Sequence, residues 1–283
     1  MKLSVALRLG RVSNLPTVTS NVLAAIALAG GVAPSRFEVV AICVAMSLMY
    51  VAGMFLNDAF DRDIDARERP ERPIPAGEVS AEAVFSTGFA MLAAGVALVG
   101  AVALAAGTGS RPILYAVSLG SLIVFYDAYH KQNPLSPIVM GLCRVGVYAT
   151  AAYAVTRDVD PALVRGMVAL LGFLIGLTYI ARQENLSRVD NLWPLAVMAV
   201  PAWLAFPHGL LAWLTYLAWL GQTAVALSLL ARRKIRDAVG LLIASISLLD
   251  ATFAANHHEP VFAINAALAF LATRWLQRSI AGT

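Results

Sequence analysis

Residues 57–77 read Asn-Asp-Ala-Phe-Asp-Arg-Asp-Ile-Asp-Ala-Arg-Glu-Arg-Pro-Glu-Arg-Pro-Ile-Pro-Ala-Gly, and they directly follow an apolar run at 37–56. Acidic side chains gather in the first two thirds of this segment, in a chain that is only 13% charged. Charge is costly near a bilayer, so ionisable residues at the end of an apolar helix favour a functional site. The segment therefore predicts a membrane helix that ends in a polar site.

The composition extends this interpretation to the whole chain. The 283 residues are 59% hydrophobic, with a mean hydropathy of +0.73. Because a soluble domain carries about a quarter charged residues, we expect an all-α integral membrane protein in which residues 1–283 form one domain. Cys43 and Cys143 lie in apolar runs, which predicts small buried side chains rather than a disulfide.

Apolar runs long enough to cross a bilayer, or nearly so, predict the spans. They lie at about 15–33, 37–57, 80–107, 112–127, 135–156, 162–181, 192–207, 209–231, 237–255 and 260–277. The runs at 112–127 and 192–207 are short, so we expect a bundle of nine to ten transmembrane helices. A polar break at Asn14 and Pro16 predicts that the first run is a retained helix and not a cleaved signal peptide.

The basic residues predict the orientation. With ten alternating spans and a cytoplasmic N-terminus, most of the 21 Lys and Arg residues fall on the cytoplasmic side. We therefore expect a multi-pass protein of the cell membrane with both termini inside. The loops at 57–77, 126–137 and 182–191 would share that face and converge on one site. The pI near 9.3 reflects these loops, and we expect no nucleic-acid partner.

The spacing of the acids adds chemistry. At about 100° per residue, Asp58, Asp61 and Asp65 fall within an arc of roughly 60° flanked by Asn57, while Asp63 points away. Three carboxylates on one face repel each other unless a cation lies between them. Mg²⁺ prefers a few carboxylates together with phosphate oxygens, so the spacing predicts a Mg²⁺ site for a phosphorylated substrate.

The pattern N-D-x-x-D-x-x-x-D, followed after six residues by R-P-I-P-A-G, resembles the first signature of the UbiA superfamily of intramembrane prenyltransferases. The matching positions are Asn57, Asp58, Asp61, Asp65, Arg72, Pro73 and Gly77. The resemblance implies a helical bundle, usually of nine spans, with a cavity open to lipid. It also implies transfer of an isoprenyl group from its diphosphate to a small, often aromatic, acceptor, with Mg²⁺ held by two Asp-rich loops.

The chemistry of such a transfer agrees with these residues. Breaking an allylic C–O bond leaves a charged diphosphate, which metal ions and basic groups stabilise, and a carbocation, which a dry cavity protects. We expect Asp58, Asp61 and Asp65 to hold the metal. Arg72 is expected to clamp the diphosphate, since a guanidinium binds phosphate oxygens in bidentate fashion; the alternative is an interfacial anchor.

Several other polar residues are candidate substrate contacts. Asn57 of the first signature is expected to contact the substrate. The segment at 126–134 resembles the family's Tyr…Lys loop, so Tyr126 and Lys131 are also expected at the substrate, with Asp127 paired to Lys131. An interfacial anchor is the alternative for Lys131.

Polar residues also interrupt the apolar helices. Arg144 is predicted to face the interior, in a site role or a buried ion pair. Asn14 is expected to line the cavity, with a packing hydrogen bond as the alternative. Asp250 is expected to make a structural polar contact.

The second family signature is only half acidic here. Its place, residues 179–191, holds Glu184 and Asp190, which lie about 120° apart on a continuous helix. A non-helical loop would let both bind a second Mg²⁺. Alternatively, Gln183, Glu184 or Asn185 would coordinate the metal through water or bind the acceptor. The third alternative is that the second metal is lost and the chain is a divergent or inactive member of the family. We predict an active enzyme with Glu184 and Asp190 as candidate ligands and substrate contacts.

Two further functions stay open. A transporter would use Arg144 and Asp250 as pathway groups, but no internal repeat is evident. A catalytically silent scaffold that binds a lipid is the other alternative. The D-G-x-x-A-R signature of CDP-alcohol phosphotransferases is absent.

Overall fold

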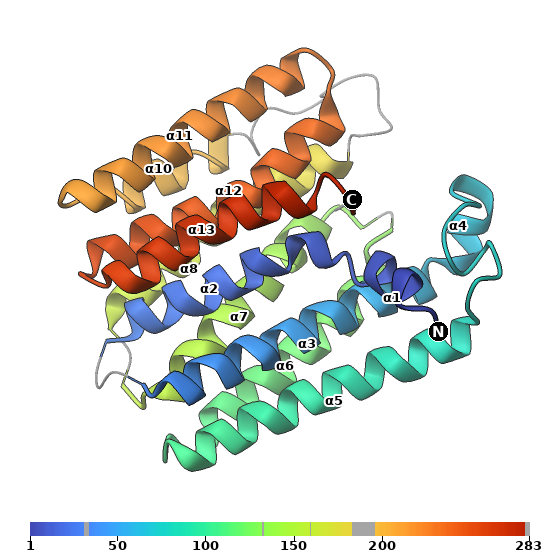
Figure 1. The fold of residues 1–283 in the computed structure, drawn as a ribbon, viewed down its shortest axis with the longest axis horizontal. Helices are drawn as coiled ribbons and strands as arrows, with labels where there is room; N and C mark the ends of the chain where they lie inside the picture. Colours follow the sequence, from blue (N-terminus) through green and yellow to red (C-terminus); the bar gives the residue numbers. More distant parts are fainter. Residues whose placement is uncertain (31–33, 132, 159, 183–195, 281–283) are drawn as a thin grey trace.

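The computed structural model describes residues 1–30, 34–131, 133–158, 160–182 and 196–280, and this part of the chain is built of helices without strands. The helices pack side by side in one bundle (Figure 1). In chain order they are α1 (Leu3–Leu9), η1 (Val12–Asn14), α2 (Leu15–Ala29), α3 (Arg36–Phe60), α4 (Arg62–Glu68), α5 (Ala81–Ala105), α6 (Arg111–Tyr129), α7 (Ser136–Val155), α8 (Pro161–Arg182), α10 (Val200–Leu204), α11 (Leu210–Ala231), α12 (Ile235–Asn256) and α13 (Pro260–Leu276).

Eight helical segments of the described chain are long and apolar enough to cross a membrane, and α13 is a shorter apolar helix. The predicted all-α membrane bundle is confirmed, and the short run at 112–127 is a full helix, α6. The predicted run at 192–207 lies partly outside the described residues. Its described part holds only the five-residue α10, with Pro201 in the first turn and Pro207 just beyond. Proline lacks the N–H that a continuing helix needs, which limits the length of this helix.

Contacts between helix ends define the two ends of the bundle. Gln277 Nε2 donates to Asn14 Oδ1 at 3.2 Å, so both ends of the chain lie at one end of the bundle. At the other end, the backbone N–H of His208 donates to Asn256 Oδ1 at 2.8 Å. That the two termini share the cytoplasmic face stays a prediction, because no contact says which side of the membrane either end faces.

Helices α2 and α12 form the centre of the bundle, and both are largely buried. Figure 1 shows α2 between α3 and α13. Much of the buried surface of the two helices consists of alanine and serine. Small side chains let helices approach closely where lipid offers no hydrophobic driving force between them.

Helix α3 carries the acid-rich segment, and its ends are fixed by local chemistry. At its start, Ser35 Oγ accepts from the Glu38 N–H at 3.2 Å, and Glu38 Oε2 accepts from the Ser35 N–H at 2.7 Å, which is a capping box. At its other end, Asp61 separates α3 from α4. The prolines at 70, 73 and 75 then keep the chain from continuing as a helix.

Two glycines let α5 lie closely against α3. A Cβ atom on Gly95 would come within 2.5 Å of Met49 Cγ, and one on Gly88 within 2.9 Å of Leu56 side-chain carbons. Because Gly88 and Gly95 have no side chains, α5 packs closely against α3 and helps to fix the position of α3 and of the acid-rich segment at its end.

Candidate active site

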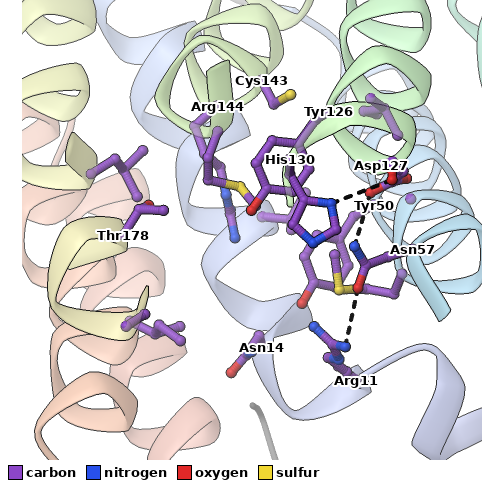
Figure 2. A pocket seen from close by; sticks show the side chains of 18 of the residues that line it. Arg11, Asn14, Tyr50, Asn57, Tyr126, Asp127, His130, Cys143, Arg144 and Thr178 are labelled. Carbon is purple, nitrogen blue, oxygen red and sulfur yellow. Dashed lines mark hydrogen bonds between the residues drawn. The ribbon is translucent and has the colours of Figure 1, made fainter. Parts of the chain in front are cut away.

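A cavity of about 350 Å³ opens between the helices at the end of the bundle that holds both termini. One part of its lining is polar, which we call the mouth, and consists of Arg11, Asn57, Asp61, Arg72, Asp127, His130 and Lys131. The rest, the interior, is mostly apolar and includes Met46, Met49, Leu174, Leu177, Ile243 and Ile246. Figure 2 shows side chains from η1, α3, α6, α7 and α8 pointing into it. A charged mouth above an apolar interior suits an amphiphilic molecule with an anionic head.

The acids of residues 57–77 divide into two faces. Asp58, Asp61 and Asp65 are 6%, 4% and 2% exposed. The Asp63 side chain is 82% exposed and contacts only Arg62 among the described cations, at 3.7 Å. The structure thus separates Asp63 from the other three, as helical spacing predicts.

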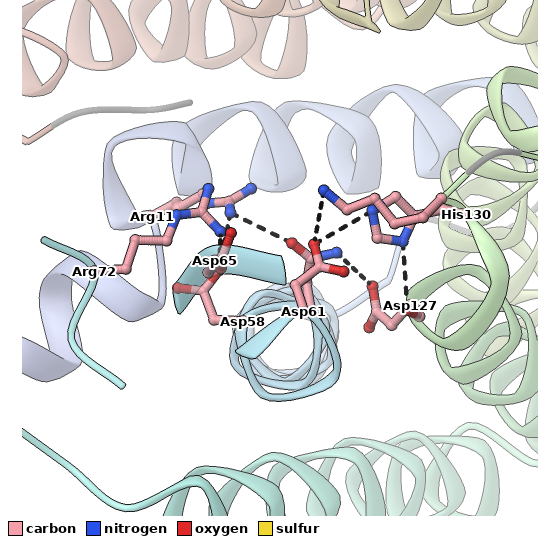
Figure 3. A network of polar contacts seen from close by, with 9 residues as sticks. Arg11, Asp58, Asp61, Asp65, Arg72, Asp127 and His130 are labelled. Carbon is pink, nitrogen blue, oxygen red and sulfur yellow. Dashed lines mark hydrogen bonds and ion pairs between the residues drawn. The ribbon is translucent and has the colours of Figure 1, made fainter. Parts of the chain in front are cut away.

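Asp58 and Asp65 share one guanidinium (Figure 3). Arg72 Nη1 lies 2.7 Å from Asp65 Oδ2 and 3.2 Å from Asp58 Oδ1. Burial raises the pKa of Asp65, and the charges of Asp58 and Asp61 add to that effect, so the opposing charge of Arg72 leaves the pKa above its ordinary value. Arg72, predicted to clamp a diphosphate, lies at the cavity and holds carboxylates in this structure.

Arg11 is the main member of the site that sequence reasoning did not find. Its Nη2 lies 3.0 Å from Asp58 Oδ1 and 3.4 Å from Asn57 Oδ1. Burial alone would lower the pKa of Arg11, but the acidic groups around it, Asp58 foremost, together raise the pKa. Its backbone is left-handed, at φ 42° and ψ 47°, just before η1. Such a conformation is unfavourable for a non-glycine residue, and strain of this kind clusters at functional sites.

Asp61 contacts a second pair of basic groups, which follow α6. His130 Nε2 lies 3.4 Å and Lys131 Nζ 3.3 Å from Asp61 Oδ2. Burial would raise the pKa of Asp61, but the hydrogen bonds and charges of these two partners together lower it. Lys131 therefore contacts Asp61 and not Asp127, so the predicted Lys131–Asp127 pair is wrong. Lys131 follows the end of α6, whereas Asp127 lies on its buried inner face.

Asn57 connects α3 to α6. Its Nδ2 donates to Asp127 Oδ1 at 3.3 Å, and the ring of His130 stacks on Tyr126 at 4.9 Å between centroids. Asp127 is 4% exposed, and its second oxygen, Oδ2, is buried without a hydrogen-bond partner in the described chain. Tyr126 lines the cavity, as predicted for a substrate contact.

Arg144 faces the bundle interior and lines the cavity, as predicted. It donates to Asn21 Oδ1 at 2.7 Å and to Thr17 Oγ1 at 3.1 Å, and its guanidinium lies 5.5 Å from the centre of the Tyr50 ring. A cation over an aromatic face is a stabilising arrangement. These contacts fix the position of the guanidinium, and none of the three partners is a carboxylate.

A buried network lies behind Arg144. Asn21 Nδ2 donates to Asp250 Oδ2 at 2.8 Å, and Asp250 also accepts from Ser20 and Tyr148. The expected structural role of Asp250 fits these contacts. Asn14 lines the cavity while accepting from Gln277, so both of its predicted roles are present.

The donor set at the mouth of the cavity fits Mg²⁺. Among the described residues, no three His, Cys, Asp or Glu side chains converge on one point, because Asp58, Asp61 and Asp65 are each paired with a cation. Their buried, mutually repelling oxygens, together with the unpartnered Oδ2 of Asp127, are nevertheless the hard ligands that this ion takes. Glu184 and Asp190, the candidates for a second metal, lie outside the described residues.

The sequence of this chain is similar to that of known proteins. The sequence profile of the UbiA prenyltransferase family matches residues 18–239. Chlorophyll synthase of Avena sativa is 28% identical over 229 residues, which cover 78% of this chain and 59% of that protein. The chain thus spans about three fifths of the length of that relative.

Solved structures share the fold. A UbiA homolog from Aeropyrum pernix K1 superposes with a TM-score of 0.63 at 16% identity, covering 85% of this chain and 96% of the other. A UbiA homolog from Archaeoglobus fulgidus bound to GPP and Mg²⁺ superposes with a TM-score of 0.55 at 16% identity, covering 96% and 99%.

Proposed function

The chain belongs to the UbiA prenyltransferase family, and on that premise we propose that it transfers an isoprenyl group from a prenyl diphosphate to a small acceptor within the membrane. The observation that supports this most is one cavity in which buried carboxylates and basic groups surround the mouth and apolar side chains form the interior. A prenyl diphosphate has the same division into a charged head and an apolar tail.

Cations prevail at the cavity, which suits an anionic head group. Its lining holds Arg11, Arg69, Arg72, Lys131 and Arg144 against the carboxylates of Asp61 and Asp127. Mg²⁺ bound by Asp58, Asp61 and Asp65 would neutralise the charge that develops on the leaving diphosphate.

The same cations would exchange partners when the diphosphate binds. Arg72 and Arg11 hold carboxylates through charge-assisted hydrogen bonds, and phosphate oxygens offer the same kind of acceptor. We therefore propose that both guanidiniums, with Lys131, move from carboxylate to diphosphate. This transfer leaves the carboxylates free for the metal.

The apolar interior would serve the transferred group. Met46, Met49, Leu174 and Leu177 line it and would hold the isoprenyl tail away from water. Excluding water protects an allylic carbocation from hydrolysis. The orientation of the tail would place its reactive carbon at the mouth, beneath Asn57 and Asp61.

Arg144 and Asn14 would form the acceptor side. Arg144 lies on the Tyr50 ring, and Tyr50 precedes Asn57 by seven residues, which is roughly 10 Å along a helix. A guanidinium at that depth suits an acceptor with a carboxylate or phosphate group. A cavity of about 350 Å³ is at the small end of ligand sites, so we propose a small acceptor, with Glu184 and Asp190 as candidates for a second metal.

A catalytically silent lipid-binding member is the competing function, because each of Asp58, Asp61 and Asp65 is already paired with a cation. Membranes that contain the protein would be incubated with labelled geranyl, farnesyl and geranylgeranyl diphosphate, with Mg²⁺ or with EDTA. We expect Mg²⁺-dependent consumption of at least one donor and a new prenylated lipid by mass spectrometry. Binding of the donors without any consumption would favour the silent scaffold.

A further inference from the structure

Asp127 is the one acid at the mouth of the cavity, among the described residues, that has no cationic partner. It lies near the end of α6, on the cavity lining, and is 4% exposed. Figure 3 shows its carboxylate next to Asp61, on the side toward α6. Whereas Asp58, Asp61 and Asp65 each contact a basic side chain, Asp127 takes part in none of the ion pairs of the described chain.

Its hydrogen bonding is equally incomplete. Oδ1 accepts one bond, from the neutral amide of Asn57 at 3.3 Å, and Oδ2 accepts none although it is buried. A buried carboxylate normally accepts several bonds or pairs with a cation, since an unpartnered charge is costly in a low-dielectric interior. Asp127 Oδ2 can therefore coordinate a ligand, and it makes no hydrogen bond within the described residues that stabilises the fold.

The charged groups around Asp127 favour a cation as the partner of its Oδ2. The negative charges of Asp61 and Asp58 act on this carboxylate, and the positive charge of Arg11 opposes them without contacting it. His130 joins the two helices here, with Nε2 3.4 Å from Asp61 Oδ2 and Nδ1 3.3 Å from the Asp127 carbonyl oxygen. A neutral donor would satisfy Oδ2 but would leave the repulsion between the carboxylates, whereas a divalent cation relieves both.

We propose that Asp127 is a further ligand of the divalent cation, so that the metal site draws on α6 as well as on α3. Its Oδ2 adds a hard oxygen donor to those of Asp58 and Asp61, and Asn57 positions the carboxylate through Oδ1. This inference rests on the proposed function, because it adds a ligand to the same site. The competing possibility is that Asp127 carries a proton permanently and binds no metal.

Metal binding tests the proposal without relying on turnover. Full-length protein in detergent would be titrated with Mn²⁺ alone, with free Mn²⁺ followed by electron paramagnetic resonance. The variants are Asp127→Asn, which keeps the shape and removes the charge, Asp61→Asn as a variant that loses a proposed ligand, and Asp63→Asn as the matched exposed control. We expect Asp127→Asn to weaken Mn²⁺ binding at least about tenfold, the lower range for disturbing a metal site, and Asp63→Asn to match the wild type.

Thermal unfolding separates a ligand from a structural acceptor. In EDTA, Asp127→Asn should unfold at a higher temperature than the wild type, because it removes an unpartnered charge and its repulsion from Asp61. Saturating Mn²⁺ should raise the unfolding temperature of the wild type more than that of Asp127→Asn.

Unchanged Mn²⁺ affinity in Asp127→Asn, with reduced affinity in Asp61→Asn, would overturn this inference and leave the proposed function standing. Lower stability of Asp127→Asn in EDTA would also overturn it, since a structural acceptor would then be the better account. A wild-type protein without any saturable Mn²⁺ site would contradict the proposed function itself.

Discussion

Replacing Arg72 by glutamine removes the guanidinium that two buried carboxylates share. Arg72 Nη1 lies 2.7 Å from Asp65 and 3.2 Å from Asp58, and the Arg72 side chain is 17% exposed. Asp58 keeps a second cation, Arg11, at 3.0 Å. Asp65 has no other cationic contact among the described residues, so it carries most of the effect.

The size of the effect follows from this difference. Removing one partner of a fully buried ion pair costs about 3–5 kcal/mol, and a hydrogen bond to a charged group contributes about 1.5–3 kcal/mol. Because the mouth of the cavity is partly open and Asp58 stays paired, we expect Arg72→Gln to lower the free energy of unfolding by about 2 kcal/mol. Loss of a donor to the leaving diphosphate should also lower kcat/KM about 10²- to 10³-fold.

The loss of stability should depend on pH with a definite sign. Burial already raises the pKa of Asp65, and removing Arg72 raises it further. An acid whose folded-state pKa is raised binds more protons in the folded state than in the unfolded one, so stability falls as pH rises. The deficit of Arg72→Gln should therefore be largest near pH 8 and shrink on acidification, as Asp65 takes up a proton.

The assay is thermal unfolding in detergent, followed by tryptophan fluorescence at several pH values with EDTA present, together with Mg²⁺-dependent diphosphate release. Arg67→Gln is the matched control, since Arg67 is an exposed arginine of the same segment whose guanidinium donates to the Asp63 backbone carbonyl and forms no ion pair within the described residues. The double variant Asp65→Asn/Arg72→Gln should recover much of the stability because the unpaired charge is gone. Arg72→Gln that matched Arg67→Gln in both stability and turnover, or a deficit that did not change with pH, would refute the reasoning.

Three further predictions concern packing, ionisation and topology. Gly95→Leu should lower the unfolding temperature, because overpacking costs about 1–3 kcal/mol. Gly221→Leu should not, because no atom of the described residues lies within 4 Å of the added Cβ. Equal unfolding temperatures would contradict the close approach of α5 to α3. As pH falls, kcat/KM should decrease when Asp65 takes up a proton, because its pKa is raised, and this should happen before Asp61, whose pKa is lowered, is protonated. A decrease in kcat/KM that begins only at or below the ordinary pKa range of aspartate would count against Asp65. Asp63→Cys should react with an impermeant maleimide only from the cytoplasmic side of oriented vesicles, and labelling from outside would reverse the proposed topology.

Features set by spacing over a few residues could be predicted from the sequence, even though Asp61 divides this segment between α3 and α4. The spacing of Asp58, Asp61 and Asp65 gives a shared buried face, and the same spacing turns Asp63 outward, because helical periodicity fixes direction over a few residues. The apolar runs likewise predict the spans, since the bilayer sets their length. Arg144 could be assigned to the interior because an intramembrane charge has few stable alternatives.

Contacts between helices could not be predicted in the same way. Arg11 is separated from Asp58 by 47 positions, and only the packing of the first segment on α3 brings the two together. Lys131 and Asp127 are near in sequence, yet the end of α6 sends them to different partners, Asp61 and Asn57. The available signal for Arg11 was its position three residues before the polar break at Asn14. Positive charge at a membrane surface, however, has a simpler explanation in topology.

The central claim is that the buried acids Asp58, Asp61 and Asp65 support metal-dependent cleavage of a prenyl diphosphate. It is tested most directly by diphosphate release from geranyl diphosphate, measured for purified wild-type protein and for Asp61→Ala, with Mg²⁺ and with EDTA. We expect release by the wild type only with Mg²⁺, and none by Asp61→Ala although it inserts and folds. Unchanged Mg²⁺-dependent release by Asp61→Ala would contradict the claim.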